Sequence, residues 1–158
     1  MLDQIVNLVK EQAVSQFVNQ TNVPDEKAEV AAQAAGESIF ETIKNQIVSG
    51  NVASLTSLLT GGNKQQSSSN PIMATIMSTL TSKLSNNGVN EETAQNASAT
   101  VVPDLMQQVI GKFMSPEKAD AEFNTENLIS SVLNNSIQGA VKDQVQKNLG
   151  NVLGGFFK

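Results

Sequence analysis

Two stretches of the chain, residues 22–40 and 88–106, follow the same layout 66 residues apart. The first is NVPDEKAEVAAQAAGESIF and the second is GVNEETAQNASATVVPDLM. Each has a valine before a pair of acids, then an alanine-containing run, and then large apolar residues. Amphipathic helices can resemble one another by chance, which is the alternative explanation. A repeated helical unit is the interpretation that constrains the fold most, because it sets the plan of both halves at once.

The same offset carries apolar residues onto apolar residues before and after these stretches. The paired positions are Val6 with Ile72, Val14 with Leu80, Val18 with Leu84, Val23 with Val89, Ala28 with Ala94, Ala31 with Ala97, Ile39 with Leu105, Phe40 with Met106, Ile43 with Val109 and Ile47 with Phe113. After Phe113 the second copy has an inserted segment before Leu128. The core-facing pattern is therefore expected to repeat even where the identities differ.

Apolar residues recur at three- and four-residue spacing along most of the chain, as in helices with one buried face. Pro24 and Pro71 suit the first turn of a helix, and Asn70 is a candidate N-cap. Pro103 lies one position beyond the residue that corresponds to Gly36 in the second copy. Gly36 and Pro103 therefore predict, in each copy, a break between a small-residue helix and an apolar one.

These elements predict an all-α fold, a compact bundle of about eight or nine short helices in two pseudo-repeated halves plus a C-terminal helix. The expected boundaries are a first repeat at 1–60, a Gly/Ser/Gln linker at 61–70, a second repeat at 71–135, and a C-terminal helix with a Phe-rich tail at 136–158. A chain of 158 residues suits one compact domain.

The composition excludes several kinds of chemistry. The chain has no Cys and no His, and all ten of its basic residues are Lys. It therefore lacks a thiolate nucleophile, an imidazole base and the usual ligands of zinc or haem. It also lacks the bidentate guanidinium that commonly clamps phosphate. The formal charge of −5 and the scattered lysines argue against nucleic-acid binding. We expect no cofactor and no metal.

Two sets of acids were considered as sites. Asp25, Glu26 and Glu29, with their counterparts Glu91 and Glu92, are expected to be solvated acids that favour the positive end of a helix dipole. Catalysis by these acids would need them to converge across a cleft.

A second set, Asp120, Glu122, Asn124 and Glu126, alternates like the early ligands of a calcium loop. Thr125 stands where that loop needs glycine, and Ser131 stands where it needs a bidentate Glu. A polar loop leading into a helix is the preferred interpretation.

Apolar residues supply two further candidates. Phe40, Met73, Met77 and Met106 could line an apolar pocket, although packing in the core is the preferred interpretation. Leu153, Phe156 and Phe157 near the C-terminus are either tucked into the body or offered to a partner.

The expected location is cytoplasmic. The first twelve residues lack a basic segment followed by a continuous apolar run, as a secretory signal would have. No apolar run approaches the roughly 18 residues that span a bilayer. We therefore expect no membrane span.

The stretches MLDQIVNLVKEQ, LTSLLTGG and VPDLMQQVIGKF, together with the Ser/Asn-rich linker, resemble small bacterial proteins of the YidB-like group, a domain type of unknown function. The resemblance covers most of residues 1–135, and the expected C-terminal helix and the terminal GGFFK depart from the pattern. It implies an all-helical protein without an agreed activity, and it assigns no functional residue.

The sequence thus favours a non-catalytic structural or protein-interaction module that binds a protein partner or itself. The alternative is a helical bundle that encloses an apolar small molecule or lipid between its halves. A third possibility is an enzyme of an unrecognised type, which convergent acids with raised pKa values would indicate.

Overall fold

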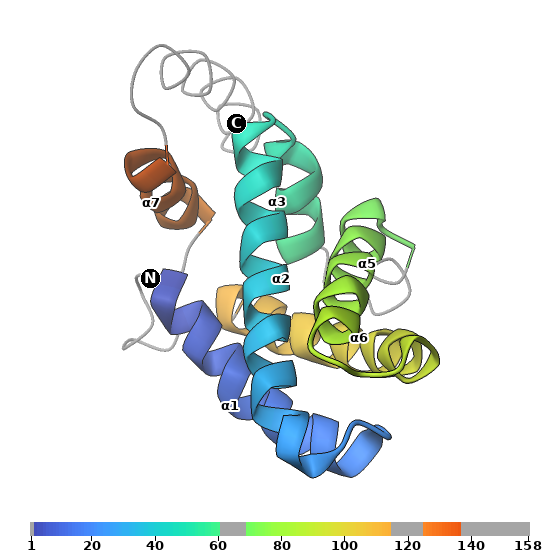
Figure 1. Cartoon of the computed structure of the whole chain (residues 1–158). Coiled ribbons are helices and arrows are strands. Elements are labelled where there is room, and N and C mark those ends of the chain that lie inside the picture. Colours follow the sequence, from blue (N-terminus) through green and yellow to red (C-terminus); the bar gives the residue numbers. More distant parts are fainter. Residues whose placement is uncertain (1, 61–68, 115–124, 137–158) are drawn as a thin grey trace.

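The computed structural model describes residues 2–60, 69–114 and 125–136, and within these ranges it is helical, without β-strands (Figure 1). In chain order the elements are α1 (Leu2–Gln20), the 3₁₀-helix η1 (Asp25–Lys27), α2 (Ala28–Val48), α3 (Val52–Thr60), α5 (Pro71–Asn86), α6 (Glu91–Met114) and α7 (Thr125–Ser136). The all-α prediction is confirmed. The segments expected to be a linker, a polar loop and a C-terminal helix (61–68, 115–124 and 137–158) lie outside the described residues.

The predicted break at Gly36 is wrong, because α2 runs through it for 21 residues. A Cβ at Gly36 would lie 3.2 Å from the backbone oxygen of Val6 and 3.3 Å from its Cγ1. The glycine therefore lets α1 cross close to α2. Its neighbours Ala35 and Ile39 are completely buried, and this packing keeps the helix continuous across it.

The predicted break at Pro103 is wrong for a related reason. Pro103 lies inside the 24-residue helix α6. Proline in a helix interior removes one backbone hydrogen bond and costs about 3 kcal/mol. Val101, Val102 and Leu105 around it are at most 1 % exposed, so burial of both flanks offsets that local cost. α2 and α6 are therefore two long helices, where the sequence predicted four short ones.

The predicted start of α5 is confirmed, whereas Pro24 lies just before η1 and not in its first turn. Asn70 caps α5, with its Oδ1 accepting a hydrogen bond from the Ile72 backbone N–H at 2.9 Å, and Pro71 occupies the first turn. At the other end of α5, Gly88 has φ of +80°, and the backbone N–H of Val89 donates to the Leu84 oxygen at 3.0 Å. This is the Schellman arrangement, which requires a left-handed residue that glycine adopts without strain.

Each of the three N-terminal helices contacts helices of the later part of the chain. α1 packs on α2 and α6, and α5 packs on α6 and α2. α3 contacts α6 and α2, whereas α7 contacts α2 and α1. In Figure 1, α2 runs through much of the length of the molecule, α6 crosses it, and α3 folds back beside its C-terminal end. The described residues therefore share one core.

That core is aliphatic and continuous. Its largest fully buried side chains are Ile5, Phe17, Ile39, Ile43, Ile47, Leu55, Leu59, Met73, Ile76, Leu80, Leu84 and Leu105. They come from α1, α2, α3, α5 and α6, so no single helix could bury its face without the others.

Burial corrects the expected register of α1 against α5. The offset of 66 residues pairs Val18 with Leu84, but Val18 is 42 % exposed and Leu84 is 1 % exposed. An offset of 67 matches the buried positions instead: Ile5 with Ile72, Val9 with Ile76, Ala13 with Leu80 and Phe17 with Leu84. Amphipathic stripes carry several apolar residues a turn, so more than one offset aligns the apolar residues of these two helices.

For α2 and α6 the offset of 66 agrees with burial. Both members are buried in the pairs Ala28 and Ala94, Ala31 and Ala97, Ala32 and Ser98, Ala35 and Val101, Ile39 and Leu105, and Ile43 and Val109.

Candidate interaction site between helices α2 and α5

The most developed polar cluster in the described residues lies where α5 meets α2. Lys83 is in the last turn of α5, and Glu37 and Glu41 are four residues apart on α2. Residues at that spacing share one helix face, so both carboxylates are presented to the same neighbour. The cluster therefore joins two helices that are far apart in the sequence.

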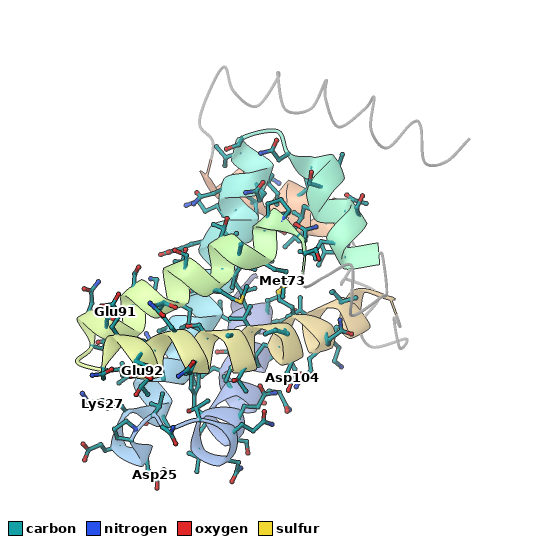
Figure 2. All side chains as sticks on the ribbon, turned by 90° about the vertical axis from the view of Figure 1, so that its right-hand side faces the viewer. Asp25, Lys27, Met73, Glu91, Glu92 and Asp104 are labelled. Carbon is teal, nitrogen blue, oxygen red and sulfur yellow. The ribbon has the colours of Figure 1, made fainter. Side chains whose placement is uncertain are left out.

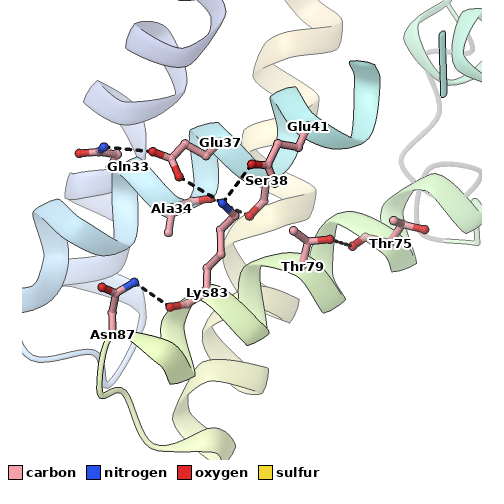
Figure 3. A network of polar contacts seen from close by, with 9 residues as sticks. All are labelled: Gln33, Ala34, Glu37, Ser38, Glu41, Thr75, Thr79, Lys83 and Asn87. Atoms are coloured by element: carbon pink, nitrogen blue, oxygen red, sulfur yellow. Dashed lines mark hydrogen bonds and ion pairs between the residues drawn. The ribbon is translucent and has the colours of Figure 1, made fainter. Parts of the chain in front are cut away.

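Lys83 makes contact with both acids (Figure 3). Its Nζ lies 3.2 Å from Oε2 of Glu37 and 3.3 Å from Oε1 of Glu41. Gln33 Nε2 donates a hydrogen bond of 3.0 Å to the other carboxylate oxygen of Glu37. The side chain of Lys83 is 26 % exposed, while those of Glu37 and Glu41 are 43 % and 49 % exposed. Pairs as exposed as these contribute only about 0.2–1 kcal/mol each, so they add little to the stability of the fold.

These contacts favour the charged form of both partners. The hydrogen bond from Gln33 is the largest cause and lowers the pKa of Glu37; burial comes next and raises it, and the hydrogen bond and the attraction of Lys83 lower it again, so the pKa is lowered overall. For Lys83, burial is the largest single effect and lowers the pKa, but the combined hydrogen bonds and attraction of Glu37 and Glu41 outweigh it and raise the pKa. Both groups are thus held charged at neutral pH.

An open groove of about 280 Å³ borders this cluster. Its lining comes from α2 and from the C-terminal end of α5: Val30, Gln33, Ala34, Glu37, Lys83, Asn86 and Asn87. Ala34 is buried, whereas Val30 is 47 % exposed. The groove thus combines a small apolar residue, amides and paired charges.

A second polar contact joins the same parts of the chain. Lys27 of η1 donates from Nζ to the backbone oxygens of Gly88 at 2.7 Å and Asn87 at 3.2 Å, just beyond α5. A cation at the carboxyl end of a helix favours the negative end of its dipole. Lys27 therefore caps a helix that begins 44 residues after it in the chain.

A smaller cavity of roughly 60 Å³ occupies the related place between the end of α1 and the helix α6. Its lining is Gln20, Thr21, Asn22, Thr93, Asn96, Ala97 and Thr100, none of which carries a charge. The larger groove is thus lined by charged residues and the smaller cavity is not.

The acids singled out in the sequence do not form a site. Asp25, Glu26, Glu29, Glu91 and Glu92 are all exposed, at or near the starts of their helices. Figure 2 shows Asp25, Glu91 and Glu92 projecting from those starts. Among the described residues no group of three His, Cys, Asp or Glu side chains is arranged to hold a metal ion.

The four residues considered for an apolar pocket lie in or against the core. Met73 and Met106 have no exposed surface, and Met77 packs on the core from outside it. Phe40 is partly buried on α2. None of the four lines either of the two grooves described above.

The remaining candidates lie outside the described side chains. These are Leu153, Phe156 and Phe157 at the C-terminus, and Asp120, Glu122, Asn124 and Glu126 of the calcium-like pattern. They stay predictions from the sequence.

The sequence did not point to Lys83, Glu37 or Glu41. The spacing of Glu37 and Glu41 was visible, because acids four residues apart share a helix face. Their partner was not, since Lys83 is one of ten scattered lysines and comes 42 residues after Glu41. Only the packing of α5 on α2 brings them together.

No family model, no curated protein and no solved structure matches this chain. The resemblance to YidB-like proteins stays a prediction from the stretches quoted above. Within the described ranges, none of the helices combines the length and the hydropathy that crossing a bilayer demands.

Proposed function

We propose that this protein is a non-catalytic helical interaction module made of two equivalent halves that bind each other. The first half is α1, η1, α2 and α3, and the second half is α5, α6 and α7. In this proposal the same faces allow the protein to bind a second copy of itself.

The bounds of the helices support the equivalence. η1 and α2 together run from Asp25 to Val48, and α6 runs from Glu91 to Met114, 66 residues later at both ends. The buried positions of α2 and α6 keep that offset, and those of α1 and α5 keep an offset of 67.

The observation that carries the proposal is the reciprocity of contacts between the halves. α1 packs on α6 as α5 packs on α2, and α3 packs on α6 as α7 packs on α2. Each half thus offers the other the same set of helices. A surface repeated in this way is self-complementary, which is the property of an interface between two like chains.

The polar cluster supports contact rather than turnover. A general acid or base works best with a pKa near the working pH. The pKa of Glu37 is lowered and that of Lys83 is raised, so each moves away from neutrality. A fixed ion pair in an open groove recognises a surface, whereas a reaction centre needs a group that readily exchanges a proton.

The apolar-ligand alternative has no such observation behind it. Met73 and Met106 are fully buried in the common core, and the larger groove is lined by amides and charges as well as apolar residues. These observations favour the interaction module over a carrier of apolar ligands.

Light scattering coupled to size exclusion tests the proposal over a range of protein concentrations. We expect reversible association of the full chain, with the mean mass rising toward that of a dimer. A single monomeric mass at every concentration would contradict self-association.

The same measurement on a chain that ends at Gly154 tests the proposed role of Phe156 and Phe157. Association through the helical halves should survive this truncation. Loss of association would assign the contact to the C-terminal phenylalanines instead.

A further inference from the structure

We propose that the contacts of Lys83 with Glu37 and Glu41 are a matching code, which pairs a first half with a second half and rejects pairs of like halves. The second half of another copy can make the same contacts as the second half of the same chain. In the dimer, each first half therefore binds the second half of the other chain, which is a domain-swapped arrangement. This inference rests on the proposed function, because it names the partner as a second copy of this chain.

The polar contacts across the junction run from one half to the other. Lys83 belongs to the second half, and both of its acids belong to the first. Lys27 belongs to the first half, and its two acceptor oxygens lie in the second. Each contact therefore needs one half of each kind.

Within the described residues, the charged cluster is found between α2 and α5 and not between α6 and α1, although the proposal treats these as corresponding pairs of helices. When α1 and α5 are aligned by their buried residues, at an offset of 67, Gln16 of α1 corresponds to Lys83 of α5. Pro103 and Gln107 of α6 stand where Glu37 and Glu41 stand in α2. The related place is therefore uncharged, and the buried Oε1 of Gln16 has no hydrogen-bond partner.

Pairs of like halves would leave charges unmatched. Two first halves would place Gln16 of one against Glu37 and Glu41 of the other, bringing two acids to the junction without a cation. Two second halves would place Lys83 against Pro103 and Gln107. Unmatched, partly desolvated charges are a recognised means by which proteins reject a wrong partner.

Lys27 adds to the same selection. Thr93 occupies its place in the second half, with an uncharged and shorter side chain. Two second halves would bring Thr93 toward the carbonyls of Asn87 and Gly88, where it cannot supply the cation that Lys27 supplies.

A swapped dimer keeps every contact between halves that the monomer has. The packing of α1 on α6 and of α2 on α5 depends on side chains and not on which chain supplies them. Exchange of like elements is a low-cost route to dimers for this reason. A short connection gives the halves of one chain an effective concentration in the millimolar range, so the monomer predominates in dilute solution.

Reversal of the charges tests the code. One variant is Lys83→Glu, and the other is the double variant Glu37→Lys with Glu41→Lys. Each variant alone places like charges together within its own chain. In a swapped dimer of the two, both junctions contain opposite charges.

The two variants are unfolded in denaturant, mixed in equal amounts and refolded at about 0.1 mM, below the effective concentration within one chain. One variant carries a ¹⁵N label, so native mass spectrometry distinguishes the mixed dimer from the two dimers of like variants. The control is one chain with all three substitutions, whose internal pairing is restored. Circular dichroism of every sample shows whether it is helical.

We expect the mixed dimer to exceed either dimer of one variant at least about tenfold, and the triple variant to behave as the natural chain does. A mixed dimer no more abundant than random pairing predicts would overturn the code. The test also works if one variant does not fold by itself, because both junctions contain opposite charges in the mixed dimer.

The outcome is separable from that of the proposed function. Random pairing of the variants, while the natural chain associates with increasing concentration, refutes the code and leaves the interaction module standing. Selective mixed pairing, while the natural chain stays monomeric, supports the code and removes self-association from the proposed function.

Discussion

At the scale of single residues, a few positions decide how the helices end and cross. Gly88 is the clearest of these, because it combines a positive φ with a close neighbour. Its φ is +80°, and a Cβ there would lie 2.8 Å from Nζ of Lys27. Both the Schellman turn and the cap from Lys27 depend on its having no side chain.

Gly88→Ala should therefore lower the free energy of unfolding by about 1–2 kcal/mol, from backbone strain and displacement of Lys27. Gly111→Ala is the matched control, since Gly111 lies within α6 and a Cβ there would meet nothing within 4 Å. We expect this control to be neutral or stabilising by up to about 1 kcal/mol. Urea unfolding measures both, and equal effects of the two changes would contradict the account of Gly88.

The ion pair predicts a defined dependence of stability on pH. Lys83→Met should cost about 0.2–1 kcal/mol at neutral pH, because the pair is partly exposed. The folded pKa of Glu37 lies below its ordinary value of 4.5, so its contribution is present above pH 4.5 and is lost as the pH falls further. The folded pKa of Lys83 lies above its ordinary 10.5, so its contribution is lost only as the pH rises beyond that value.

The difference in unfolding free energy between the natural chain and Lys83→Met should thus be constant between about pH 5.5 and pH 9.5 and shrink outside that window. Lys44→Met on α2 is the control, because the structure gives Lys44 no ion pair within the described residues. A difference that varied strongly near pH 7 would show that another group dominates.

At the scale of helices, tertiary packing overrides local breakers. α6 continues through Pro103, even though the ring removes one hydrogen bond of the helix. The helix persists because Val102 and Leu105 are buried on its face. Replacement of Pro103 should therefore restore the free energy of unfolding that the missing hydrogen bond costs.

Pro103→Ala should accordingly raise the free energy of unfolding by about 1–3 kcal/mol, since alanine restores the missing donor and has the highest helix propensity. Urea unfolding followed by circular dichroism measures it. Ala99→Pro, at an exposed position one turn earlier, should destabilise by a similar amount or more. Destabilisation by Pro103→Ala would mean that the proline ring itself is needed for packing.

The sequence predicted helices well where the signal was local. The Asn70 cap, the proline of the first turn and the apolar stripes of α2 and α3 need only neighbouring residues to be recognised. Continuity through Gly36 and Pro103 could not be predicted, because the packing that sustains it comes from other helices. The alignment of α1 with α5 could not be predicted to one residue, since several offsets align their apolar residues.

The candidate site was less predictable than the fold. Its members were common residue types, and what distinguishes them is the meeting of α2 with α5. The acidic pairs Asp25–Glu26 and Glu91–Glu92 are exposed, as their position at the starts of helices predicted.

At the scale of the whole molecule, the halves depend on each other for burial. The central helices α2 and α6 each contact the first helix of the other half, and α1 and α5 each contact both central helices. Neither half can hide its apolar face alone. The described residues should therefore unfold as one cooperative unit.

Native-state hydrogen exchange tests this mutual dependence most directly. We predict that the slowest amides of α2, such as Ile43, and of α6, such as Val109, report the same free energy of opening and the same dependence on urea. Protection that persists in α2 under conditions where α6 has already exchanged would contradict the account, because it would mean that the first half is stable without the second.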